Sequence, residues 1–128
     1  LQKIPFHSAN VVTEAISGAV KSMAQDLEAT AIICLTESGF TSRLISKHRP
    51  ECPIIAITGS ERVARRLSMN WGVAAVLYTG ESNDEARIQF ASDCVQEMGF
   101  ATTGDSIIVT AGQAQRSGGT DMIRVLTF

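Results

Sequence analysis

The residues best suited to chemistry lie together in the short stretch 35–43, which reads Leu-Thr-Glu-Ser-Gly-Phe-Thr-Ser-Arg. This stretch follows an apolar, β-branched run and precedes a helical pattern. Backbone N–H groups at the start of a helix lack intrahelical partners, and the helix dipole favours an anion there. Four hydroxyl side chains can add hydrogen bonds to such an anion: Thr36, Ser38, Thr41 and Ser42. The stretch therefore predicts a phosphate-binding turn, although the same residue types also serve as ordinary helix caps that bind no ligand.

Elsewhere the chain offers no arrangement of residues typical of catalysis or metal binding. His7 and His48 are isolated, so the sequence contains neither a Ser-His-Asp set nor a metal-ligand spacing. We interpret the three cysteines as reduced thiols, with Cys34 and Cys94 in apolar packing. We therefore expect no catalytic residue and no metal site in this chain.

Composition narrows the class of protein. Apolar residues make up 45% of the chain, and its formal net charge is −2. The longest uninterrupted apolar run, 73–78, is far shorter than the ~20 residues that a membrane-spanning helix needs. The first residues lack the apolar core of a signal peptide, and no cluster of lysine and arginine indicates a nucleic-acid partner. These features predict a cytoplasmic protein with no membrane or nucleic-acid partner.

The elements that must position the turn are indicated by apolar periodicity and by capping residues. Helices are predicted from Ser8 or Asn10 to about Leu27, over about 40–48, over about 61–70 with Ser60 as the cap, and from a cap at Asn83 or Asp84 to Gly99. The expected buried stripes are Val12, Ile16, Val20, Met23 and Leu27 in the first helix, and Ile88, Ala91, Val95 and Met98 in the last. Strands are predicted at 31–35, 54–58, 73–78, 106–111 and 122–127.

Short buried strands that alternate with helices favour a parallel sheet covered on both faces. The connection before the last strand is too short for a parallel crossover, so we expect that strand to be antiparallel. The predicted fold is α/β: a three-layer α/β/α sandwich with a mostly parallel five-stranded sheet. We expect residues 1–128 to form a single domain, in which residues 1–8 lead into the first helix.

Three loops should meet at the edge of the sheet where ligands bind in open α/β folds, beyond the carboxyl ends of the strands. They are 36–42, 79–84 and the glycine-rich 112–120. Together these loops predict a cleft with backbone amides on one side and a flexible glycine loop on the other.

Several motifs, in one collinear order, carry a family resemblance: the turn 36–41, Arg49-Pro50, 53–58, Trp71-Gly72-Val73, Thr103-Gly104-Asp105 and 117–121. From about Val12 to Phe128, the chain resembles the C-terminal domain of pyruvate kinase. None of these motifs is specific alone, but their order and spacing are. The resemblance implies one pyruvate kinase C-terminal-like domain over residues 1–128.

The resemblance also implies a role. Such a domain regulates and assembles an enzyme of glycolysis that transfers a phosphoryl group from phosphoenolpyruvate to ADP. The catalytic barrel, with its magnesium and potassium ions, lies upstream in these enzymes, so we expect no cofactor in this domain. A first residue that is leucine rather than methionine is consistent with a piece of a longer protein. The family further implies a homo-oligomer in which C-terminal domains pair, and the first helix and last strand are candidates for that contact.

The resemblance assigns residues to an effector site. Thr36, Ser38, Gly39, Phe40 and Thr41 fall on the loop that grips one phosphate in sugar-bisphosphate-regulated members. Arg87 aligns with an arginine that holds the second phosphate, and 112–119 aligns with a loop that closes over the effector. The complete predicted effector site is Thr36, Glu37, Ser38, Gly39, Phe40, Thr41, Arg87, Arg116, Gly118 and Gly119.

The chain departs from the bisphosphate-activated pattern at several of these positions. Glu37 stands where such relatives often have lysine or a neutral residue, and Gln113 and Ala114 stand where they have tryptophan and arginine. Arg116 could replace the lost charge. We therefore expect a monophosphate to be favoured over fructose 1,6-bisphosphate, or the site to be vestigial. Two alternatives remain open: a stand-alone sensor of phosphorylated metabolites and a purely structural dimerisation module.

Overall fold

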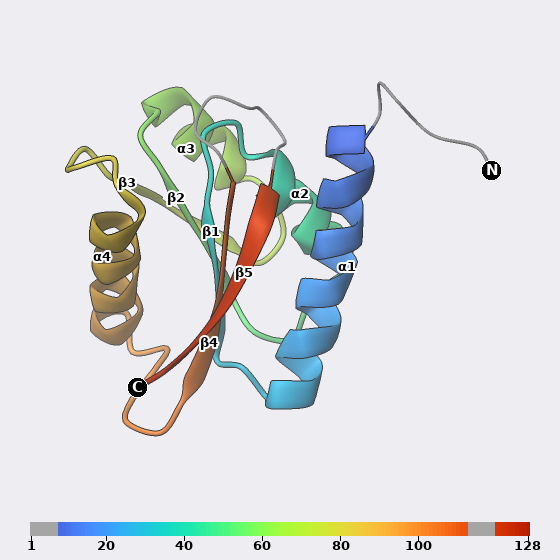
Figure 1. The fold of residues 1–128 in the computed structure, drawn as a ribbon. Helices are drawn as coiled ribbons and strands as arrows, with labels where there is room; N and C mark the ends of the chain where they lie inside the picture. Colours follow the sequence, from blue (N-terminus) through green and yellow to red (C-terminus); the bar gives the residue numbers. More distant parts are fainter. Residues whose placement is uncertain (1–7, 113–119) are drawn as a thin grey trace.

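A five-stranded sheet between layers of helices forms the fold, which a computed structural model describes for residues 8–112 and 120–128 (Figure 1). The helices are α1 (Ser8–Leu27), α2 (Phe40–Lys47), α3 (Glu61–Leu67) and α4 (Asp84–Glu97). The strands are β1 (Ala31–Leu35), β2 (Ile54–Thr58), β3 (Val73–Leu77), β4 (Ser106–Gly112) and β5 (Thr120–Thr127). Most predicted boundaries agree with these within one or two residues, but α3 ends at Leu67 rather than at 70.

The strands lie in the order β3-β2-β1-β4-β5. All neighbours are parallel except β4 and β5, which are antiparallel, so the predicted sheet is confirmed. From β1 the chain adds β2 and then β3 on one side of β1, whereas β4 and then β5 are added on the other side. This reversal of direction falls at the carboxyl end of β1, where Leu35 is paired with both Ile57 and Ala111. In open α/β sheets, this is the place where ligands bind.

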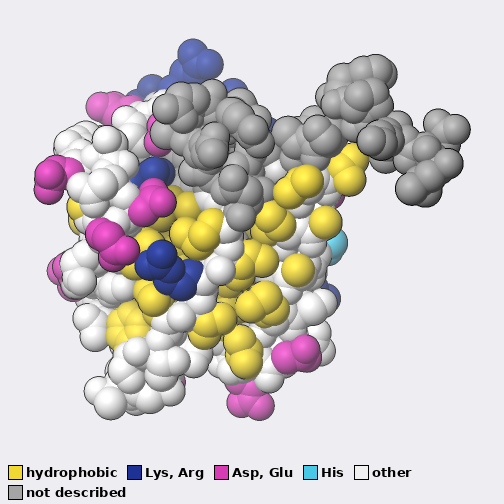
Figure 2. Space-filling view, in the orientation of Figure 1, with side chains coloured by type: hydrophobic (Ala, Val, Ile, Leu, Met, Phe, Trp, Pro, Cys, Tyr) yellow, Lys and Arg dark blue, Asp and Glu magenta, His cyan; other side chains and the backbone are white. Residues whose placement is uncertain are grey.

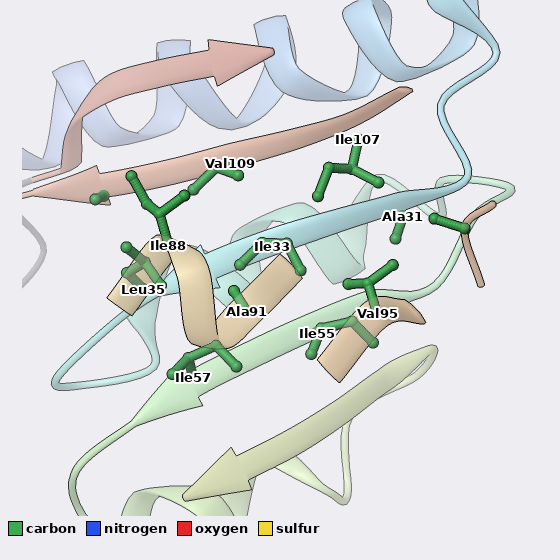
Figure 3. Packing of buried hydrophobic residues seen from close by; sticks show 12 residues of the cluster. Ala31, Ile33, Leu35, Ile55, Ile57, Ile88, Ala91, Val95, Ile107 and Val109 are labelled. Carbon is green, nitrogen blue, oxygen red and sulfur yellow. The ribbon is translucent and has the colours of Figure 1, made fainter. Parts of the chain in front are cut away.

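One face of the sheet is covered by α4, and the other face by α1, α2 and α3 (Figure 1). Figure 3 shows the α4 side, where Ile88, Ala91 and Val95 of the helix lie against strand residues such as Ile33 and Ile57. Both β1 and β2 are buried along their whole length because helices cover both of their faces. This explains why these strands are continuous apolar runs instead of alternating ones.

The predicted caps of two helices are confirmed. The Ser60 hydroxyl accepts a hydrogen bond from Val63 N at 3.2 Å, and the Asn83 side chain accepts one from Ala86 N at 2.8 Å. Gly99, which follows α4, has a φ of 79°, as expected of a residue that ends a helix in the left-handed region.

The predicted buried stripe of α1 is partly wrong. Val12 and Leu27 are exposed, whereas Thr13 and Ser17 are buried beside Val20. Burial of Ser17 is tolerated because its hydroxyl donates to the Thr13 carbonyl oxygen at 2.8 Å. Helical spacing alone did not distinguish this face from the apolar one next to it.

Two expectations for α4 also need correction. Met98 is 40% exposed, because α4 ends at Glu97 and Met98 caps the helix. Cys94 is only partly buried, whereas Cys34 is buried in the core as predicted. Desolvation raises the pKa of the Cys34 thiol above its ordinary value of 9.0, more than hydrogen bonding to Ser42 and Thr110 lowers it.

The raised thiol pKa predicts a loss of stability at alkaline pH. The thiol of Cys34 ionises in the unfolded chain at a lower pH than in the folded protein. Its contribution to the free energy of unfolding is therefore complete below about pH 9 and is lost as the pH rises above that value. We expect Cys34→Ala to reduce the alkaline slope of the unfolding free energy by up to about 1.4 kcal/mol per pH unit. Urea unfolding between pH 8 and 11 would measure this, with the less buried Cys94→Ala as the control. Equal slopes in the wild type and Cys34→Ala would contradict it.

Candidate functional site

The turn that follows β1 is held in place by its backbone. Thr36 N donates to the Ile57 carbonyl oxygen at 2.9 Å, so the chain stays tied to β2 for one residue beyond β1. Gly39 then adopts a φ of 82°, and a Cβ atom at this position would lie 2.9 Å from Leu67 Cδ2. Glycine therefore permits both the left-handed conformation and the close approach of α3. The result is a tight bend that aims the first turn of α2 at the carboxyl edge of the sheet.

Two hydroxyls of the turn already accept hydrogen bonds from the turn's own backbone amides. Thr36 Oγ1 accepts a hydrogen bond from Gly39 N at 2.8 Å, and Ser38 Oγ accepts one from Phe40 N at 3.3 Å. Thr36 and Thr41 are buried, and Ser38 is only partly exposed. An anion at this turn would have to compete with these bonds, of which the one to Ser38 is the longer and weaker.

The Ser42 hydroxyl does not face the turn's open side, contrary to our expectation. Ser42 is fully buried, and its side chain lies beside the Cys34 thiol. Its position follows from the helix: Ser42 lies on the inner face of α2, as does Ile45. Ser42 is therefore part of the core packing and cannot reach a ligand at the turn.

Arg87, in the first turn of α4, is brought to the same turn. Its side chain is only 7% exposed, and its Nη2 atom lies 3.5 Å from Oε2 of Glu37, whose side chain is 50% exposed. Within the described part of the chain, Glu37 is the only group paired with this guanidinium. A guanidinium carries five N–H donors, so Arg87 can bind further acceptors beside Glu37. Arg87 is therefore a largely buried cation whose ion-pair partner among the described residues is Glu37.

A small cavity of about 130 Å³, lined in part by Glu37 and Arg87, lies beyond the ends of β2 and β3. Tyr78 forms part of its wall; its hydroxyl donates to the Glu81 carbonyl oxygen at 2.7 Å, and its ring packs on Phe90 at 4.7 Å between centroids. Loop 79–84 is thereby held over the cavity. Tyr78 was not among the residues predicted from the sequence, although its position directly after a strand that ends at this edge was an available signal.

The predicted site residues divide into two groups. The structure brings Glu37 of the turn to Arg87, and these two line the same cavity, whereas the other predicted residues of the turn do not line it. Arg116, Gly118 and Gly119 lie outside the described residues, as do Gln113 and Ala114. Phe40 is partly buried and carries the Arg43 guanidinium 5.8 Å from its ring centroid. Among the described residues that line this cavity, Arg87 is the cation that could bind an anion.

The described residues contain neither a metal site nor a membrane span. Across residues 8–112 and 120–128, no group of His, Cys, Asp or Glu side chains is placed to hold a metal ion. None of the described helices has the length and apolar character needed to cross a bilayer.

The chain is similar to known proteins of one kind. Residues 14–126 match the family model described as "Pyruvate kinase, alpha/beta domain". The chain is 38% identical to a pyruvate kinase of Lactococcus lactis over 121 residues, which are 94% of the chain and 24% of that relative. It is 40% identical to a pyruvate kinase of Clostridium acetobutylicum over 114 residues, which are 88% of the chain and 24% of that relative. The chain thus spans about a quarter of the length of these curated relatives.

The conformation of the turn predicts opposite effects of two glycine-to-alanine substitutions. Gly39→Ala should lower the unfolding free energy by about 1–2 kcal/mol, since it strains the backbone and displaces the buried Leu67. Gly18→Ala, within α1, has nothing within 4 Å of the new Cβ and should raise it by about 0.5–1 kcal/mol. Denaturant unfolding of both variants would measure these changes. A Gly39→Ala variant as stable as the wild type would contradict the turn geometry.

Proposed function

The chain belongs to the pyruvate kinase alpha/beta domain family, and from this premise we propose that it is the regulatory and assembly domain of a pyruvate kinase. That enzyme transfers a phosphoryl group from phosphoenolpyruvate to ADP in glycolysis. Catalysis belongs to the remainder of a longer cytoplasmic polypeptide, a barrel with its metal ions. This domain contributes indirectly, by binding a phosphorylated effector at the turn 36–41 and by joining subunits.

The observation that best supports effector binding is the buried Arg87 beside the turn. A buried charge is costly unless it is paired and hydrogen-bonded, and Glu37 supplies only one long contact. A phosphate in the adjoining cavity would give the guanidinium several short acceptors. Arg87 is therefore the group that makes an anion at this place favourable.

The size of the cavity supports a small phosphate ligand. Sites for drug-sized molecules have volumes of about 300–1,000 Å³, whereas this cavity has about 130 Å³. It suits a phosphate group whose remaining atoms extend outward. We therefore favour a monophosphate, such as a sugar phosphate or a nucleoside monophosphate, over fructose 1,6-bisphosphate.

Glu37 acts as an internal competitor for Arg87. Its half-exposed carboxylate can turn to water when a phosphate arrives, and the site then has two arrangements: Arg87 with Glu37, or Arg87 with phosphate. An effector regulates an enzyme only if it binds two states with different affinity. The exchange of partners at Arg87 supplies such a difference at the point where β1, α2 and α4 meet.

A separate face suits assembly into an oligomer. Figure 2 shows hydrophobic side chains gathered between α4 and α1, over β4 and β5. Val11 and Val12 of α1 and Val125 of β5 are exposed, and β5 is an edge strand. Edge strands and exposed apolar surface are usually protected by a partner. We propose that two copies of the domain pair through this α1–β5 face.

A second candidate is a purely structural dimerisation module. The hydrogen bonds from Gly39 N to Thr36 and from Phe40 N to Ser38 favour it, because they satisfy the turn without a ligand. The two functions differ in whether phosphate compounds bind at all.

Charge removal at Glu37 and Arg87 tests the effector site. We expect Glu37→Gln to tighten binding of a sugar monophosphate about fivefold, because it removes a repulsion of about 1 kcal/mol in a solvated cleft. Arg87→Gln should abolish binding. Glu85→Gln is the matched control, since Glu85 also lies in the first turn of α4 but pairs with Arg124 at 3.7 Å. Isothermal titration calorimetry at physiological ionic strength would measure all three.

Two results would contradict the proposal in different ways. Micromolar binding of fructose 1,6-bisphosphate by the wild type would overturn the preference for a monophosphate. Failure of every phosphate compound to bind both the wild type and Glu37→Gln would leave only the structural module.

A further inference from the structure

One wall of the cavity beside Arg87 is a tyrosine that is held from three directions. Tyr78 N donates to the Thr58 carbonyl oxygen at 2.8 Å, so the backbone stays tied to β2 beyond the end of β3. The Tyr78 ring packs on Phe90 of α4, with 4.7 Å between ring centroids, and its hydroxyl donates to the Glu81 carbonyl oxygen at 2.7 Å. A side chain restrained in this way has little conformational entropy left to lose when a ligand binds.

The loop between β3 and α4 is folded against the hydroxyl of this tyrosine. A Cβ atom at Gly80 would lie 2.6 Å from Tyr78 Oη and 2.7 Å from Cζ, so glycine is what lets the backbone pass this close. The loop then ends at Asn83, which caps α4. We call this arrangement the Tyr78 clasp, and its members are Tyr78, Gly80, Glu81 and Phe90.

The clasp limits the space that is available beside Arg87. Tyr78 and Gly80 line the cavity together with Glu37 and with the buried end of β2, residues 57–58. The cavity has about 130 Å³, whereas sites for drug-sized molecules begin at about 300 Å³. A second phosphate group on a ligand bound to Arg87 would therefore lie close to the Glu37 carboxylate or compete with the clasp for space.

Tyr78 limits this space by its shape and not by a donated hydrogen bond. A tyrosine hydroxyl has one donor proton, and here the Glu81 carbonyl oxygen accepts it. Arg87 is the cation among the described residues that line the cavity, so the attraction for an anion comes from Arg87. Tyr78 is therefore placed to select among anions and not to attract them.

We propose that Tyr78 is the specificity-determining residue of the effector site: the clasp fills the space that a second phosphate group would need, so a ligand with one phosphate group binds and a bisphosphate is excluded. This inference rests on the proposed function, because it concerns the same site. It assigns separate tasks to two neighbouring residues. Arg87 binds the phosphate group, and Tyr78 acts as a positioning residue that limits what can be attached to it.

Calorimetric titration of the full-length protein with fructose 6-phosphate and fructose 1,6-bisphosphate tests this role, because the two sugars differ by one phosphate group. Only binding that is lost in Arg87→Gln is assigned to this site. We expect the wild type to bind the monophosphate about tenfold more tightly than the bisphosphate. Tyr78→Ala removes the ring and should reduce this ratio about fivefold, chiefly because the bisphosphate then binds more tightly.

Three further variants separate the ring from its surroundings. Gly80→Ala keeps the ring but forces the loop away from the Tyr78 hydroxyl, so it should lower the ratio as Tyr78→Ala does, and it decides the question if Tyr78→Ala fails to fold. Tyr78→Phe keeps the ring that fills the space and should retain the wild-type ratio. Leu77→Ala is the matched control, because it truncates the neighbouring side chain, which does not line the cavity, and it should also retain the ratio.

The outcomes distinguish failure of this inference from failure of the proposed function. Binding that depends on Arg87, with a ratio in Tyr78→Ala and Gly80→Ala equal to that of the wild type, would overturn the role of Tyr78 and retain the effector site. A ratio in Tyr78→Phe as low as in Tyr78→Ala would overturn selection by the shape of the ring. If neither sugar bound to any of these proteins in a manner that depends on Arg87, both the effector site and the role of Tyr78 would be overturned.

Discussion

Arg87 is a buried cation, and its burial limits what can happen at the carboxyl edge of the sheet. Its side chain is only 7% exposed and lines one cavity together with Tyr78 and Gly80. Glu37, whose side chain is 50% exposed, lies 3.5 Å from the guanidinium. A largely buried cation makes the adjoining cavity more favourable for an anion than for an apolar group. The proposed effector chemistry and the competition with Glu37 both follow from this constraint.

The sheet order brings these distant residues together. Glu37 follows β1, and Arg87 lies in the helix that crosses from β3 to β4 over the face of the sheet. Because β4 returns beside β1, the start of α4 comes to lie over the carboxyl ends of β1 and β2. The same reversal places α4 on one face of the sheet and α1, α2 and α3 on the other.

Much of this fold could be predicted from the sequence, because β-branched runs such as 54–58 and caps such as Ser60 and Asn83 are local signals. The errors arose where burial depends on tertiary packing. Spacing in α1 could not show that Thr13 and Ser17, and not Val12, face the sheet, and Met98 was exposed by the end of its helix. The turn 36–41 was recognisable by residue type. Its ion pair was not, since nothing local indicates that Glu37 reaches Arg87.

A double-mutant cycle would test the exchange of partners at Arg87. The unfolding free energies of the wild type, Glu37→Gln, Arg87→Gln and the double variant give the coupling between the two side chains. We predict a favourable coupling without ligand that falls toward zero when saturating inorganic phosphate is present, since phosphate then replaces Glu37 at the guanidinium. A coupling that stays the same with and without phosphate would show that Arg87 never leaves Glu37, and the proposed effector site would be wrong.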